Sequence, residues 1–203
     1  MLNLKVWRYF YFGMSCIVIT LLASPVYRSF FPPDSDLYLS MSILGEDLEL
    51  INYYPENNLN ISVGSNVFWS IRLSNEMGEV KYLSVVVKLV NSRVLSPDSI
   101  NCVPSSGDEL ITLKYVLGDA ESHLLPFSWE IINATRIESG VEISGLIING
   151  HVIDGEFVSE LGDDFKLIFE LWAYDPSSGE FKFSIDFDGT PQCVWNQVIF
   201  NIS

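Results

Sequence analysis

The chain contains few of the residues that carry nucleophilic, metal-binding or phosphate-binding chemistry. Its 203 residues include 2 His, 3 Cys and 11 Lys plus Arg, against 26 Asp plus Glu, and the formal net charge is -15. A nucleic-acid partner requires clustered basic side chains, so this charge balance excludes one. Glycine-rich phosphate loops are absent, and no Cys or His pair has the ligand spacing of a zinc site. The sequence therefore predicts no cofactor and no small-molecule substrate.

Apolar residues, by contrast, are plentiful. Hydrophobic residues make up 48% of the chain, with 13 Phe, 9 Tyr and 5 Trp. A disordered chain lacks the apolar content that offsets its ordering entropy, and this chain has it. The length fits one domain of ordinary size with an appendage.

The charge distribution separates the appendage from the domain. Residues 1–33 contain Lys5, Arg8 and Arg28 and no acid. The rest of the chain then holds 8 basic and 26 acidic side chains, a formal charge of -18. We therefore expect the two parts to lie in different solvents.

An uncharged segment from Tyr9 to Tyr27 predicts a membrane span. As a helix it would extend roughly 29 Å, close to the hydrocarbon core of about 30 Å. Aromatic residues flank both ends, as in interfacial belts. We predict a cytoplasmic segment 1–8, a transmembrane helix 9–31, a Pro-rich linker 32–36 and an extracytoplasmic domain 37–203. The basic residues before the span favour a cytoplasmic amino terminus.

The alternative is a cleaved signal peptide, which would give a secreted soluble domain. Lys5 and Arg8 provide a basic start, but the sites after Ala23 and Ser24 have Leu21 or Pro25 at unfavourable positions. A lipoprotein is disfavoured because Cys16 precedes the main apolar run. The sequence favours a retained anchor.

The remainder of the chain shows mainly a period of two, which is typical of strands. Val67, Trp69, Ile71 and Leu73 alternate with more polar residues. Further strands are expected at 37–44, 81–90, 110–116, 127–132, 141–148, 151–157, 165–174, 181–187 and 194–202. Asn149-Gly150 is the signal of a two-residue hairpin turn, and residues 96–109 are expected to form a loop. This pattern predicts an all-β sandwich.

Several motifs resemble one known family. They are Leu37-Tyr38, Leu44-Gly45, Tyr54-Pro55, Asn57, Val63-Gly64, Ile71, Leu73, Asn75-Glu76, Val80-Lys81-Tyr82 and Val85-Val86-Val87-Lys88-Leu89, with closing strands at 166–172 and 195–201. They are similar to the extracytoplasmic domain of the archaeal membrane-protein family called domain of unknown function 1616. The resemblance implies an immunoglobulin-like or CARDB-like sandwich outside an archaeal membrane, with no known activity. Typical members carry several spans, whereas this chain has one predicted span.

Catalysis would have to use one of the two histidines, His123 or His151. Ser122 and His123, which follow Glu121, are the basis of an alternative hypothesis, an envelope hydrolase that uses these two residues and a distant acid, but the Gly-x-Ser-x-Gly elbow is missing. We interpret both histidines as solvated turn residues. No catalytic residue is therefore predicted.

Acidic pairs are the remaining candidates for metal ligands. They are Asp34 with Asp36, Asp163 with Asp164, and Asp186 with Asp188. None completes a calcium loop, and alternation around a buried Phe187 explains the last pair. No metal site is therefore predicted.

Two kinds of covalent modification are expected in the outer domain. Cys102 and Cys193 are predicted to form a disulfide, because outside the cytoplasm thiols tend to oxidise and Cys16 lies in the span. The competing interpretation is two buried, reduced cysteines. Asn60, Asn133 and Asn201 stand in N-glycosylation triplets, and Asn60 has the best loop context.

The sequence thus favours a membrane-anchored, non-catalytic binding or assembly module of the cell envelope. Its expected partner is another envelope or membrane protein.

Overall fold

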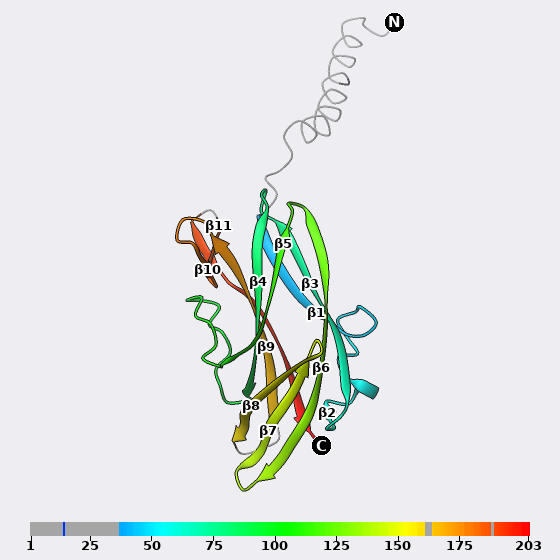
Figure 1. Ribbon diagram of the computed structural model, residues 1–203. Helices are drawn as coiled ribbons and strands as arrows, with labels where there is room; N and C mark the ends of the chain where they lie inside the picture. The colour runs from blue at the N-terminus through cyan, green and yellow to red at the C-terminus, as the bar shows by residue number, and fades with distance from the viewer. Residues whose placement is uncertain (1–13, 15–36, 161–163, 188) are drawn as a thin grey trace, which may run out of the picture. The chain divides into compact units, whose positions relative to one another are not determined.

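The computed structural model describes residues 14, 37–160, 164–187 and 189–203. Residues Leu37–Ser203 form one compact unit, shown in chain-order colours in Figure 1. Apart from Met14, the predicted segments 1–8, 9–31 and 32–36 lie outside the described residues. Within the described part, no helix has the length and apolarity needed to cross a membrane.

The described chain is built almost entirely of strands. They are β1 (Tyr38–Leu44), β2 (Asn60–Ile61), β3 (Asn66–Glu76), β4 (Lys81–Asn91), β5 (Glu109–Leu117), β6 (Glu121–Ile137), β7 (Gly140–Ile148), β8 (His151–Glu160), β9 (Asp164–Asp175), β10 (Glu180–Lys182), β11 (Ile185–Phe187), β12 (Thr190–Gln192) and β13 (Val194–Ile202), with one 3-10 turn, η1 (Pro55–Asn57). The all-β prediction is confirmed.

Two sheets make the sandwich. One has five strands in the order β1-β3-β6-β7-β8, and the other has six, β2-β13-β9-β4-β5 with β10 paired to β9 (Figure 1). Strands β1, β3 and β6 stand in the order A-B-E of an immunoglobulin sandwich, and β13, β9 and β4 in the order G-F-C. The β7–β8 hairpin occupies the place next to strand E.

The core lies between the sheets because alternate side chains of each strand point inward. On β3, Trp69, Ile71 and Leu73 are buried, as the alternation predicted. Trp69 packs against the ring of Phe127 at a centroid distance of 6.1 Å and against Phe169 of the other sheet at 6.1 Å. Aromatic side chains therefore join the two sheets at the centre of the core.

The hairpin signal at Asn149-Gly150 is confirmed. Both residues have positive φ, 49° and 80°, and Ile148 pairs with His151 across the turn. Left-handed backbone at both central positions is what a type I′ turn requires, and glycine adopts it without a steric cost.

Two of the expected strands differ most from the structure. The strand expected at 181–187 is two short strands, β10 and β11, which pair with different partners. Strand β6 is longer than 127–132 and includes Pro126. Proline fits there because β6 pairs with β7 only from Trp129 onward, so Pro126 has β3 as its single neighbour.

Candidate functional site

The outer face of the six-stranded sheet carries an exposed row of aromatic rings. Tyr82, Tyr174 and Phe181 come from the neighbouring strands β4, β9 and β10, and their ring centroids lie 5.0–5.9 Å apart. Tyr82 is 39% exposed and Tyr174 38%. The ammonium of Lys114 on β5 lies 5.2 Å from the Phe181 ring centroid, within the range of a cation–π contact. We call Tyr82, Tyr174 and Phe181 the aromatic row.

A groove continues from this row along the same face. Its volume is about 570 Å³, and its lining combines an aromatic floor with charged and hydroxyl groups: Ser84, Val86, Lys88, Pro104, Gly107, Asp108, Glu109, Thr112, Lys114, Trp172 and Phe181. Alternation explains the floor, because Ser84 and Trp172 are register partners on β4 and β9 and lie two residues along each strand from Tyr82 and Tyr174, on the same face. We call this feature the aromatic groove.

The groove's far wall is the loop of residues 92–108, which folds back over the sheet and which we call the covering loop. The loop packs closely: a Cβ on Gly107 would lie 2.2 Å from Cγ1 of Val90. Only glycine therefore lets the loop approach β4 at this point.

A buried ion pair anchors the covering loop. Lys88 Nζ lies 3.0 Å from Glu170 Oε2 and donates a 2.6 Å hydrogen bond to the Ser105 carbonyl. Glu170 Oε1 accepts the Ser105 backbone N–H at 2.7 Å. The Lys88 side chain is 8% exposed and the Glu170 side chain 0%. Every charged atom is thus paired, as burial of charge requires.

A second set of contacts holds the tip of the covering loop against β13. Ser96 Oγ donates to Gln197 Oε1 at 2.7 Å, and Trp195 Nε1 donates to Ser99 Oγ at 2.9 Å. The same tip exposes Ile100, whose side chain is 88% accessible. The tip is therefore fixed in place while it presents an apolar side chain to solvent.

Asp98 organises the turn within this tip. Its carboxylate accepts the backbone N–H groups of Ile100 at 2.8 Å and Asn101 at 3.2 Å, and the Asn101 side-chain amide at 2.6 Å. The side-chain bond from Asn101, followed by the backbone bonds from Ile100 and Asn101, lowers the pKa of Asp98. The charged form is thus the one that the folded tip prefers.

The two cysteines of the domain meet at the same tip. Cys102 is buried and Cys193, which precedes β13, is half-buried; both are free thiols in this structure. The Cys193 thiol donates to the Asp98 carbonyl at 3.7 Å. Burial, then the hydrogen bond and charge of Cys102, and then the charge of Asp98 raise the pKa of Cys193 to about 12.

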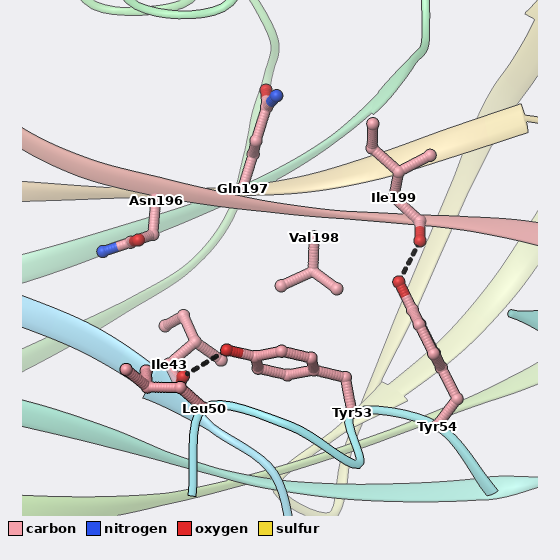
Figure 2. A pocket seen from close by; sticks show the side chains of 8 residues that line it. All are labelled: Ile43, Leu50, Tyr53, Tyr54, Asn196, Gln197, Val198 and Ile199. Carbon is pink, nitrogen blue, oxygen red and sulfur yellow. Dashed lines mark hydrogen bonds between the residues drawn. The ribbon is translucent and has the colours of Figure 1, made fainter. Parts of the chain in front are cut away.

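A smaller pocket, of about 310 Å³, lies between β1 and β13 and is shown in Figure 2. Tyr53 donates its hydroxyl to the Ile43 carbonyl at 3.1 Å, and Tyr54 donates its hydroxyl to the Ile199 carbonyl. Burial raises the pKa of both phenols, and the charge of Tyr53 adds to the effect on Tyr54. Because both hydroxyls are engaged with main-chain carbonyls, the pair ties the loop after β1 to both sheets.

The residues of the hydrolase hypothesis are not brought together. Ser122 and His123 are successive residues of β6, so their side chains point to opposite faces. Ser122 Oγ lies 2.6 Å from Ser74 Oγ, whereas the His123 ring stacks on Tyr115 at 4.0 Å. Our interpretation of His123 as a solvated turn residue was wrong, because it lies within a strand. His151 is exposed beside its turn, as expected.

The glycosylation candidates lie at two places. Asn60 was expected in a loop, but it lies on β2 and pairs with Asn201 of β13. The side-chain amide of Asn201 donates to Asn60 Oδ1 at 3.3 Å. Asn133 is exposed at a bulge of β6, and its side-chain amide donates to Ser144 Oγ at 2.7 Å.

The structure describes only part of the acidic pairs. Asp34, Asp36, Asp163 and Asp188 lie outside the described residues. Among the residues that the structure places, no group of three or more His, Cys, Asp or Glu side chains could hold a metal ion.

The sequence interpretation missed the aromatic groove and its buried ion pair. A usable signal existed for the pair, because Lys88 and Glu170 each stand between two apolar residues of a largely apolar strand. Opposite charges at such positions in two buried strands indicate mutual pairing.

Comparison with known proteins yields only slight structural likeness. No family model and no curated protein matches the chain. The CARDB domain of a Pyrococcus furiosus protein, solved in complex with di-metal ions, is 9% identical over 83% of this chain and 90% of that one, with a TM-score of 0.40. The sporulation control protein Spo0M of Bacillus subtilis is 10% identical over 81% and 49%, with a TM-score of 0.37. The C-terminal domain of Wzt is 8% identical over 88% and 84%, with a TM-score of 0.36. Similarity this slight supports no inference about function.

Proposed function

We propose that this chain is a membrane-anchored, non-catalytic binding module of the cell envelope that contacts another envelope protein through the outer face of its six-stranded sheet. The observation that carries the proposal is the aromatic row, continuous with the aromatic groove. Tyr82 and Tyr174 are more than a third exposed although they belong to strands whose other residues are mostly buried.

Exposed aromatic side chains on a rigid sheet favour a protein partner. Tyrosine and tryptophan are enriched in the energetically dominant positions of protein interfaces, and contiguous exposed apolar surface marks such sites. Val116 on β5, which is 58% exposed and pairs with Tyr82, extends the patch to the sheet edge. Backbone hydrogen bonds fix all four strands, so the surface is preorganised and binding requires little ordering.

Charge indicates the chemistry of the partner. Residues 37–203 contain 8 basic and 24 acidic side chains, and the groove is edged by the exposed carboxylates Asp108 and Glu109. A partner segment that combines apolar with basic residues would complement this surface. Its association should be accelerated by attraction and slowed by salt.

Anchoring and orientation belong to the proposal as well. We place the span at 9–31, the segment 1–8 in the cytoplasm and the domain outside, on the apolar length and flanking charges of the sequence. Protease added to intact cells stripped of outer layers should digest the domain and spare residues 1–8. The mass of the mature protein would separate this from the secreted alternative. Three further points remain predictions. They are membership of the domain of unknown function 1616 family, a CARDB-like form of the sandwich, and an archaeal source.

Site-directed photocrosslinking in native membranes tests the binding surface. A photoreactive phenylalanine analogue would replace Val116, and in a control it would replace Phe68, which is 54% exposed on the outer face of the five-stranded sheet. We expect one adduct of discrete mass from position 116 and none from position 68. The adduct should disappear when Tyr174→Ala and Phe181→Ala are added. Equal labelling at both positions, or adducts indifferent to those changes, would contradict the proposal.

A further inference from the structure

The covering loop and β13 are brought together at a pair of thiols. Cys102 and Cys193 are far apart in sequence, yet the Cys193 thiol donates to the Asp98 carbonyl at 3.7 Å, and Asp98 bridges Val103, the residue after Cys102. Cys102 is 8% exposed. Both residues therefore sit in one confined place at the junction of loop and strand.

Backbone structure fixes the orientation of Cys102. Its φ is 50°, in the left-handed region that non-glycine residues seldom adopt. The neighbouring bridge between Asp98 and Val103 holds it there, through N–H···O bonds of 2.9 and 3.2 Å in the two directions. A residue kept in such a conformation by its surroundings indicates a positional requirement.

We propose that Cys102 and Cys193 form an intramolecular disulfide in the envelope, and that this bond clasps the covering loop onto β13. The proposal rests on the shared junction of loop and strand and on the hydrogen bond from the Cys193 thiol to the carbonyl of Asp98, which bridges Val103, the residue after Cys102. The inference does not depend on the proposed binding surface, since a clasped loop stabilises the domain whether or not a partner exists.

The oxidation needs a disulfide donor, R–S–S–R, as the oxidant. One cysteine thiolate attacks a donor sulfur, which forms a mixed disulfide and releases one RSH after protonation. The second cysteine then loses its proton, attacks the mixed disulfide and releases the second RSH. Two electrons and two protons pass from the cysteine pair to the donor, and one S–S bond replaces another.

The environment of Cys193 predicts when this occurs. With its pKa raised to about 12, little of this thiol is ionised at neutral pH, and the thiolate is the attacking species. Formation should therefore be fast while the loop is still open during folding and slow once it has closed. A bond formed in this confined place should also resist added thiols.

The disulfide would also help to keep the ion pair of Lys88 and Glu170 buried. The covering loop supplies the Ser105 backbone groups that bond to Lys88 and Glu170. Holding the loop closed keeps water from these charges. Reduction should accordingly loosen the loop and the wall of the aromatic groove before it affects the rest of the sandwich.

Peptide mapping of the full chain from its native membrane is the direct test. A Cys16→Ser background removes the third thiol, and free thiols are blocked by alkylation in denaturant before digestion, because Cys102 is buried in the folded domain. We expect one linked pair of peptides that contain Cys102 and Cys193 and a monomeric mass. Alkylated, unlinked cysteines at both positions would overturn the proposal.

A stability measurement distinguishes the clasp from chance oxidation. Reducing agent should lower the Tm of the Cys16→Ser protein by about 10 °C or more, given a closed loop of about 90 residues, and it should leave the Cys102→Ser/Cys193→Ser double variant unchanged. In a second arm, oxidised glutathione is added to the reduced protein during refolding. An intramolecular bond is expected, and a persistent mixed disulfide with glutathione at either cysteine would contradict the proposed geometry.

Discussion

The two sheets of the sandwich differ in how their outer faces are covered. In the five-stranded sheet, β3 alternates buried and exposed residues along its whole length, and its outer face meets solvent. In the six-stranded sheet, β4 is buried on both faces from Leu83 to Val90, because the covering loop lies over the outer face. The sheet that is partly covered by its own chain is also the one with a groove and an exposed aromatic row. Covering part of a face thus creates an edge at which a binding surface can form.

Each sheet also contains a buried polar side chain or pair with several hydrogen-bond partners. In the five-stranded sheet it is neutral: Asn75 is fully buried, and its side-chain nitrogen donates to the carbonyls of Glu79, Leu117 and Gly118 at 2.8–3.1 Å. In the six-stranded sheet it is the charged pair Lys88–Glu170. Removing a partner should cost more free energy of unfolding at the ionic centre than at the neutral one, because it leaves a buried charge unpaired.

The largest effect is expected at the ion pair. Lys88→Met leaves the Glu170 carboxylate buried without its cation, and it should lower the free energy of unfolding by about 3–5 kcal/mol. The double variant Lys88→Met/Glu170→Leu should recover much of that loss, because no unpaired charge remains. Lys81→Met is the control: its partner Glu79 is 67% exposed, so a loss within about 1 kcal/mol is expected. Urea denaturation measures all three, and a double variant worse than the single would contradict this account.

The neutral centre should be less sensitive. Asn75→Ala removes a donor from buried carbonyls and should cost about 1–3 kcal/mol of unfolding free energy. Asn66→Ala, an exposed position on the same strand, should cost within about 0.5 kcal/mol. If Asn75→Ala proved more damaging than Lys88→Met in the same denaturant series, the proposed ranking of ionic over neutral centres would be wrong.

The difference between the sheets also decided what the sequence could predict. Where one face is solvated, polarity alternates with the strand period, so 67–73 and the hairpin at Asn149-Gly150 were predicted correctly. The strands at 81–90 and 165–174 were located too, but their continuous apolar runs hid which side chains face outward. Strand order depends on pairings between distant segments, which no local pattern encodes.

Most of the candidate site could not be predicted from the sequence pattern. Of the loop expected at 96–109, all but Glu109, which begins β5, is a loop, yet nothing local shows that it folds back over β4 and β9. Tyr82, Tyr174 and Phe181 meet only because three strands stand in register. The disulfide between Cys102 and Cys193 was predicted from compartment, cysteine count and position in the chain, and it remains a prediction.

A moderate effect is expected where the two sheets touch at β5 and β6. His123→Gln removes a ring stacked on Tyr115 at 4.0 Å and an interplanar angle of 15°, and it should cost about 0.5–1.5 kcal/mol. His151→Gln, at an exposed turn, should cost within about 0.5 kcal/mol. Thermal denaturation compares the two. Neither change should reduce crosslinking from position 116; an associated loss of hydrolytic activity would favour the enzyme hypothesis instead.

The smallest effect is a local one, in the tip of the covering loop. The hydrogen bonds that Asp98 accepts from Asn101 and Ile100 lower its pKa below the ordinary 3.8, so the folded tip binds a proton less readily than the unfolded chain. Its contribution to stability is complete above the unfolded pKa and is lost as the pH falls through the folded pKa. The amide signals of Ile100 and Asn101 in an NMR titration should therefore shift with a midpoint below 3.8. Asp98→Asn should abolish that titration.

The backbone amide of Ser128 in the five-stranded sheet is the control, because it donates at 2.8 Å to the side-chain oxygen of Asn149, which does not titrate. A midpoint at or above 3.8 for the loop amides would show that the Asp98 turn does not prefer the charged carboxylate.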